Sequence, residues 1–122
     1  LLKSKFLRTI WPTLLWAFFI LSASVLTTPK VDGVKLFPHV DKLVHFILYG
    51  ILTFLMILYR KEKFIEESKL ILLIAFSWGF TIELLQHYCT INRQFELLDL
   101  GANFSGIIFV KLLLSRIKIN LT

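Results

Sequence analysis

Polar side chains that could bind a ligand or transfer a proton are concentrated in two stretches of an otherwise apolar chain. Three pairs of them share a spacing of four residues: Asp41 with His45, Glu83 with His87, and Asp99 with Asn103. Residues four apart lie on one face of a helix, so each pair would present its two polar groups together. The residue types are those used for proton transfer and for hydrogen bonding to a ligand.

Glu83 and His87 are the first candidates for a general acid and base, because proton transfer needs groups whose pKa can be tuned. Asp41 and His45 are further candidates, with the carboxylate orienting the imidazole. Arg93 would suit a phosphate or a carboxylate, since a guanidinium can donate two parallel hydrogen bonds.

Three more polar residues are candidate ligand-binding groups in the same region: Gln86, Asp99 and Asn103. Gln86 borders the face of Glu83, three residues away. Two histidines and three carboxylates could also hold a divalent ion, but the chain has no HExxH or cysteine-rich signature. We therefore expect no metal and no cofactor.

The elements that carry these groups are predicted to cross a membrane. Apolar residues make up 57% of the 122, charged residues only 18%, and the mean hydropathy is +0.75. A soluble domain is nearer 45–50% apolar and 25% charged. Four apolar runs have roughly the length of a spanning helix, about residues 10–26, 43–59, 70–88 and 97–114. The sequence thus predicts an all-α fold, a four-helix transmembrane bundle that forms one domain over residues 1–122.

Basic residues indicate how this bundle is oriented. If the N-terminus is cytoplasmic, ten of the fourteen Lys and Arg residues fall on the inner side (Lys3, Lys5, Arg8, Arg60, Lys61, Lys63, Lys69, Lys111, Arg116 and Lys118). This bias follows the positive-inside rule, so we expect both termini to be cytoplasmic. The net charge of +6 then has a topological origin, and we expect the lipid bilayer, rather than nucleic acid, as the partner.

The same topology brings the candidate residues to one depth, near the outer leaflet. They come from the second, third and fourth spans and from the loop between the last two (Asp41, His45, Glu83, Gln86, His87, Arg93, Asp99 and Asn103). An acid at the centre of a span costs on the order of 3 kcal/mol, less near an interface, so such groups normally face protein or water. We expect a polar pocket open to the outer face.

Small residues four apart also predict close helix packing. The pairs are Ala75 with Gly79, Gly101 with Ser105, and Ala102 with Gly106. Because small side chains let helix backbones approach in lipid, we expect a tight contact around the third and fourth spans. The first span could instead be a cleaved signal peptide, since Ser22-Ala23-Ser24 resembles a cleavage site. Its length and its tryptophans favour a retained helix. The single cysteine, Cys89, excludes an internal disulfide.

Four motifs, in this order, resemble the VanZ-like family of small bacterial membrane proteins: Asp41-Lys42-x-x-His45-x-x-x-Tyr49, Glu83-x-x-Gln86, Arg93, and Asp99-x-x-x-Asn103-x-x-Gly106. The resemblance covers about residues 41–106. One departure concerns Arg93, which in relatives often follows a Pro-Gly turn and precedes Ser or Thr. Here it stands in Ile91-Asn92-Arg93-Gln94, in a loop that is one residue longer.

The resemblance implies a role in the bacterial cell envelope, sometimes linked to glycopeptide (teicoplanin) resistance, and no established reaction. Two classes of function therefore stay open. One is a protein of the bacterial cytoplasmic membrane that binds or processes an envelope component such as a lipid-linked phosphate, either with or without turnover. The other is a non-catalytic protein whose polar residues hold the helices together or bind a partner.

Overall fold

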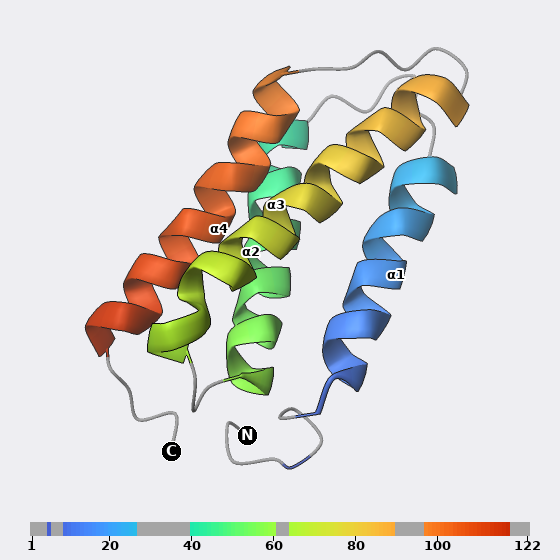
Figure 1. Ribbon diagram of the computed structural model, residues 1–122. Helices are drawn as coiled ribbons and strands as arrows, with labels where there is room; N and C mark the ends of the chain where they lie inside the picture. The colour runs from blue at the N-terminus through green and yellow to red at the C-terminus, as the bar shows by residue number, and fades with distance from the viewer. Residues whose placement is uncertain (1–4, 6–8, 27–39, 61–63, 90–96, 118–122) are drawn as a thin grey trace.

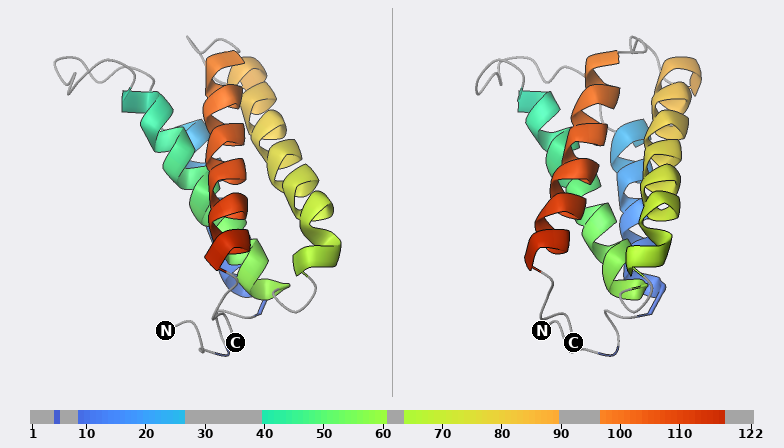
Figure 2. Two further views of the ribbon diagram at one scale, coloured as in Figure 1. Left: turned by 90° about the vertical axis from the view of Figure 1, so that its left-hand side faces the viewer. Right: turned by 60° about the vertical axis from the view of Figure 1, so that its left-hand side comes forward.

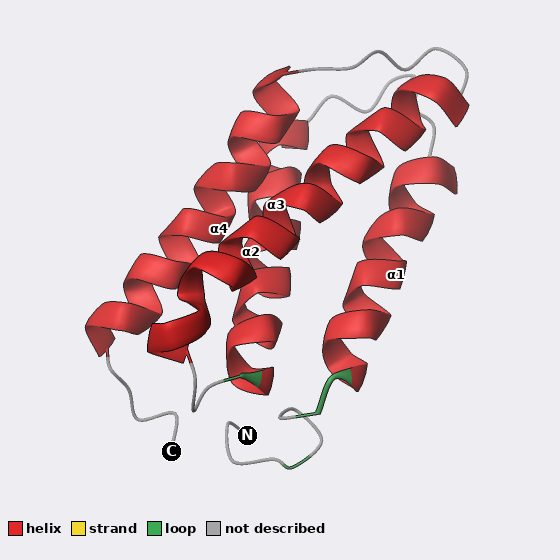
Figure 3. Ribbon diagram, in the orientation of Figure 1, coloured by secondary structure: helices red, strands yellow, loops and turns green. Residues whose placement is uncertain are grey.

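Four helices make up the described part of the chain. The structure, a computed structural model, describes residues 5, 9–26, 40–60, 64–89 and 97–117. Within these residues there is no strand, and the helices are α1 (Trp11–Leu26), α2 (Val40–Tyr59), α3 (Phe64–Cys89) and α4 (Leu97–Ile117) (Figures 1 and 3). The predicted all-helical bundle is confirmed.

Helix boundaries follow local physical rules. Pro12 stands at the second position of α1, where the N–H that proline lacks would have no intrahelical partner. Helix α4 has Asp99 in its first turn and Arg116 in its last turn. A negative charge at the N-terminus and a positive charge at the C-terminus both stabilise the helix dipole.

Three of the helices are long and apolar enough to cross a membrane. The spans are Lys42–Tyr59 in α2, Ser68–Tyr88 in α3 and Leu97–Arg116 in α4. Helix α1 is apolar but has 16 residues, and at 1.5 Å per residue it is about 24 Å long. The hydrocarbon core of a bilayer is about 30 Å thick. The chain is therefore a membrane protein with three helices of full spanning length and a shorter apolar helix packed beside them.

The helices run alternately up and down, so α2 and α4 are parallel to each other (Figures 1 and 2). Helix α2 makes its most extensive contact with α4, while α1 packs on α2 and α3. The buried core is aliphatic, with Ile20, Ile57 and Ile107 fully enclosed. Large apolar side chains on the outer faces of all four helices are exposed, as expected for surfaces that face lipid.

Glycines set the closest contact between α2 and α4. A Cβ atom added to Gly106 would overlap the carbonyl oxygen of Phe46 and lie 3.0 Å from its carbonyl carbon. One turn further along, a Cβ on Gly50 would lie 3.3 Å from Val110. The two backbones can pack this closely only because no side chain stands between them.

Close contacts occur around α3 and α4, as the small residues predict, but not at every small residue. Gly79 of α3 does approach α4, since a Cβ there would lie 2.9 Å from Asn103 Nδ2. Gly106 faces α2 instead, and Gly101 is exposed, with nothing within 4 Å of an added Cβ. Spacing alone identified small faces but did not indicate which neighbour each face would meet.

Candidate functional site

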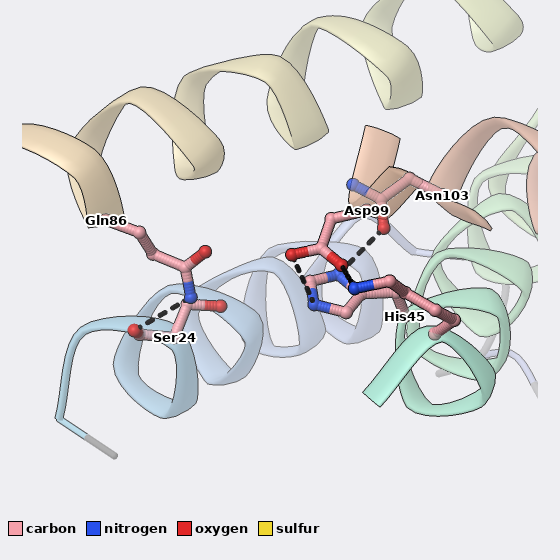
Figure 4. Close-up of polar contacts among 6 residues, drawn as sticks. Ser24, His45, Gln86, Asp99 and Asn103 are labelled. Atoms are coloured by element: carbon pink, nitrogen blue, oxygen red, sulfur yellow. Dashed lines mark hydrogen bonds and ion pairs between the residues drawn. The ribbon is translucent and has the colours of Figure 1, made fainter. Parts of the chain in front are cut away.

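Four polar side chains from α2 and α4 meet at the end of the bundle where these helices begin. They are Lys42 and His45 of α2, and Asp99 and Asn103 of α4, and we call them the α2–α4 polar cluster. Lys42 Nζ lies 2.7 Å from Asp99 Oδ1. His45 Nδ1 lies 3.0 Å from Asn103 Oδ1, and His45 Nε2 lies 3.8 Å from Asp99 Oδ2 (Figure 4).

The parallel course of α2 and α4 explains why these residues meet. Lys42 and His45 are three residues apart and share one helix face, and Asp99 and Asn103 are four apart and share another. When two helices run parallel, the first residue of one face lies beside the first residue of the other, and the second beside the second. Lys42 accordingly pairs with Asp99, and His45 with Asn103.

Asp99 is the anionic centre of the cluster. Its side chain is 8% exposed, and its two oxygens face Lys42 and His45, whose side chains are 20% and 12% exposed. A carboxylate that loses this much water needs compensating cations or donors. The first turn of α4 adds a favourable dipole, because the helix N-terminus carries partial positive charge. The short Lys42 contact is an ion pair that compensates part of this charge.

The imidazole of His45 is held between two oxygen atoms. With Asn103 Oδ1 as acceptor, the Nδ1–H group of His45 is the donor. This bond fixes the orientation of the ring and directs Nε2 at Asp99. The distance of 3.8 Å is longer than a hydrogen bond, so Nε2 and Asp99 interact through charge when the ring is protonated.

Tyr49 lies one turn deeper on α2 than His45. It is 1% exposed, and its ring packs on the backbone of Gly79, where a Cβ would lie 3.2 Å from Tyr49 Cε1. Within the described part of the chain, its hydroxyl has no hydrogen-bond partner. Exposure therefore falls steadily along this face of α2, from Lys42 through His45 to Tyr49.

The polar residues of α3 divide between the interior and the surface. Glu83 and Gln86 are buried, at 1% and 2% exposure. Gln86 Nε2 donates to the carbonyl oxygen of Ser24 at 3.0 Å and thereby joins α3 to the last turn of α1 (Figure 4). His87 is exposed, and its ring packs edge-on against Tyr88 at 4.7 Å. The Glu83–His87 pair thus has one buried and one exposed member, although four residues separate them.

The side chains of two predicted site residues, Asp41 and Arg93, lie outside the described part of the structure. Asp41 belongs to the first turn of α2, but its side chain lies outside the described part of the chain. Arg93 is also outside the described residues. The expected role of Asp41 in orienting His45 stays a prediction, while Asp99 and Asn103 are the groups that the structure places beside the His45 ring.

Sequence reasoning did not include Lys42, Ser24 or Tyr49 among the site residues. Lys42 could have been found, because it lies three residues before His45 on the same face and precedes a long apolar run. Tyr49 belongs to the same row, four residues after His45. Ser24 contributes its backbone carbonyl to Gln86, and no side-chain pattern indicates such a contact.

The described residues contain no group of three or more His, Cys, Asp or Glu side chains arranged to hold a metal ion. The cluster instead combines one ammonium group, one imidazole, one carboxylate and one amide. These groups can bind an anion, exchange a proton, or join two helices.

Comparison of the chain with known protein families, with curated proteins and with solved structures gave no match in any of the three searches.

Proposed function

We propose that the chain is a VanZ-like protein of the bacterial cytoplasmic membrane that binds the anionic headgroup of an envelope lipid, such as a lipid-linked phosphate, at the α2–α4 polar cluster. One observation carries the proposal. The Lys42–His45 motif and the Asp99–Asn103 motif, over fifty residues apart in the sequence, are in direct contact through pairs at 2.7 and 3.0 Å. Those are the motifs on which the family resemblance rests.

The charges of the cluster suit an anion. Lys42 is the most exposed of the three charged or titratable members, at the end of the bundle where two parallel helices direct their N-termini. Helix N-termini attract negative charge, and an ammonium group is a common partner of phosphate. A ligand phosphate would compete with Asp99 for Lys42, while Asp99 would retain His45.

The surroundings of the cluster suit a lipid rather than a soluble anion. Leu43 and Val44 follow Lys42 on α2 and are each 47% exposed. Leu97 and Leu98 precede Asp99 on α4 and are exposed as well. A ligand whose anionic group meets Lys42 would find apolar side chains directly beside it, which is the polarity pattern of an amphiphile with a charged head.

Binding is better supported than turnover. Catalysis by His45 would require Nε2 to reach a substrate atom, and in this arrangement Nε2 faces Asp99. The proposal accordingly assigns recognition to Lys42 and positioning to Asp99 and Asn103. The ten basic residues on the proposed inner side support cytoplasmic termini. The cluster would then lie at the headgroup layer of the outer leaflet.

A second candidate function is purely structural. Its support is that polar contacts join several helix pairs: Gln86 with Ser24, Trp16 Nε1 with the Leu48 carbonyl at 2.9 Å, and the cluster itself. Interhelical hydrogen bonds in membranes typically contribute less than about 2 kcal/mol each. In this case the cluster would stabilise the bundle and bind no ligand.

Binding of a long-chain polyprenyl phosphate and of the matching polyprenol to the purified full chain would separate the two. The proposal predicts tighter binding of the phosphate, by about ten- to hundredfold, since a hydrogen bond to a charged group contributes roughly 1.5–3 kcal/mol. Lys42→Gln should abolish most of that preference. Lys69→Gln, an equal change of charge near the beginning of α3 at the opposite end of the bundle, should retain it.

Asp99→Asn provides the discriminating variant. A binding site predicts that phosphate affinity is kept or raised, because Lys42 loses its competing carboxylate while Asn can still accept a hydrogen bond. A structural role predicts lower stability and no ligand preference in any variant. Equal affinity of the wild-type chain for phosphate and alcohol would refute the binding proposal.

A further inference from the structure

At the opposite end of the bundle, α2 and α4 end and α3 begins (Figures 1 and 2), and the described basic residues near these helix ends are Arg60, Lys69, Lys111 and Arg116. In the topology predicted from the sequence, ten of the fourteen Lys and Arg residues belong to the inner segments, with three of the eight acidic residues (Glu62, Glu66 and Glu67). The difference gives these segments a formal charge of +7. The remaining four basic and five acidic residues leave −1 for the rest of the chain.

Lys111 is the most informative of these residues, because it lies inside a spanning segment. It belongs to the Leu97–Arg116 span of α4 and precedes the end of the helix at Ile117 by six residues, or about 9 Å. It makes no ion pair with any described residue and is partly exposed. An ionisable side chain at this depth is costly unless it finds a partner, and a lysine can extend its ammonium group toward the headgroups.

The helix dipole does not account for all of the basic residues. Arg116, in the last turn of α4, is well placed to stabilise the C-terminus of that helix. Lys69 is exposed in the second turn of α3, too far from the C-terminus of that helix to stabilise its dipole, and it makes no ion pair within the described part of the chain. Another source of negative charge would compensate both Lys69 and Lys111.

The surroundings indicate that this source is the lipid headgroup layer. Leu70 follows Lys69, Leu112 follows Lys111, and both leucines are about half exposed. Arg60, just after α2, lies over the ring of Tyr59 at 5.6 Å. Tyrosine and basic residues at helix ends are typical of the boundary between hydrocarbon and headgroups.

We propose that this end of the bundle binds the phosphate of an anionic phospholipid, with Lys111 as the principal contact and Arg116 as a second cation nearer the helix end. Charge complementarity supports an anionic lipid over a zwitterionic one, because basic clusters next to spanning helices attract anionic leaflets. The site is separate from the α2–α4 polar cluster and does not depend on the function proposed for it.

The test uses the full chain in nanodiscs of phosphatidylcholine, with and without phosphatidylglycerol, at one ionic strength. Thermal unfolding should occur at a higher temperature in the discs that contain phosphatidylglycerol. Lys111→Gln should lose at least half of this difference, whereas Lys111→Arg should keep it. Lys35→Gln, the same charge change far from this end in sequence, should also keep it. Native mass spectrometry should show fewer retained phosphatidylglycerol molecules on Lys111→Gln than on the wild-type chain.

Three results would overturn the proposal. One is an equal phosphatidylglycerol effect in Lys111→Gln and wild type. Another is an equal loss in Lys111→Gln and Lys35→Gln, which would indicate a response to net charge alone. The third is full stabilisation of the chain in phosphatidylcholine discs by inorganic phosphate, which would indicate a free-anion site. If Lys111→Gln does not fold, Arg116→Gln gives the same comparison and should lose a smaller share of the effect.

Discussion

Replacing Gly106 by alanine tests the contact that aligns α2 with α4. The new Cβ would overlap the Phe46 carbonyl oxygen and lie 3.0 and 3.2 Å from the carbonyl carbon and Cα of the same residue. All three atoms belong to the backbone, so no side chain can rotate away. The two helices would have to separate or slide past each other.

The size of the effect follows from two opposing terms. Overpacking of a tight interface typically costs about 1–3 kcal/mol, and more when backbone must move. Alanine gains up to about 1 kcal/mol over glycine in helix propensity. Since the clash is with backbone, the overpacking cost should lie in the upper part of its range, about 2–3 kcal/mol, and the net loss in the free energy of unfolding should be about 1–2 kcal/mol.

Gly101→Ala is a matched control on the same helix. Nothing lies within 4 Å of a Cβ at Gly101, so only the propensity term applies and stability should rise by up to about 1 kcal/mol. Unfolding in mixed micelles, followed by the loss of helical circular dichroism, measures both variants against the wild-type chain. Opposite signs are predicted. A neutral or stabilising Gly106→Ala would refute the close α2–α4 packing and, with it, the register that brings the polar cluster together.

Three further substitutions can be measured in the same unfolding assay. Gly79→Ala should cost less than Gly106→Ala, about 1 kcal/mol, because its Cβ would meet the Asn103 and Tyr49 side chains rather than backbone; a larger loss would mean that these side chains cannot adjust. Tyr49→Phe should leave stability unchanged or raise it by about 1 kcal/mol, since it removes a buried hydroxyl that has no hydrogen-bond partner among the described residues; a clear loss would show that the hydroxyl is bonded. Gln86→Leu should cost about 0.5–2 kcal/mol by removing the bond to the Ser24 carbonyl, and an unchanged stability would count against that link between α3 and α1.

The helices could be predicted because hydropathy sums over many residues. The expected span at 97–114 became Leu97–Ile117, and the one at 43–59 became Val40–Tyr59. The expected span at 70–88 lies within Phe64–Cys89, whose first turns are polar. The first expected span, 10–26, matches α1 in position. At 16 residues α1 is shorter than the other three helices, and its hydropathy alone did not predict this.

The site could be predicted only in part. Sequence spacing correctly placed Asp99 and Asn103 on one face, and the parallel course of α2 and α4 followed from the number of spans. The rotation of each helix about its own axis did not follow. That rotation is set by non-local packing such as the approach of Gly106 to Phe46, and it decides that His45 faces α4.

Rotation and depth also separate the α3 residues. Glu83 is enclosed by the bundle, whereas His87, one turn nearer the helix end, is exposed. A four-residue spacing predicts a shared face but not where that face leaves the protein interior. The same limit applies to Lys42: its place on the face of His45 could be read from the sequence, but its contact with Asp99 depends on the register of two helices that are distant in sequence.

Photo-crosslinking with a diazirine-bearing polyprenyl phosphate tests the central claim most directly, because it reports where an anionic lipid binds. The photoreactive group should stand next to the phosphate, and the attachment sites should be read by peptide mass spectrometry. If the lipid binds at the α2–α4 polar cluster, labelling should occur in the first turns of α2 and α4, at residues such as Val44 and Leu98. Unlabelled polyprenyl phosphate should displace this labelling, and polyprenol should not. Labelling spread evenly over the lipid-facing helices, or displaced equally by the alcohol, would contradict the account.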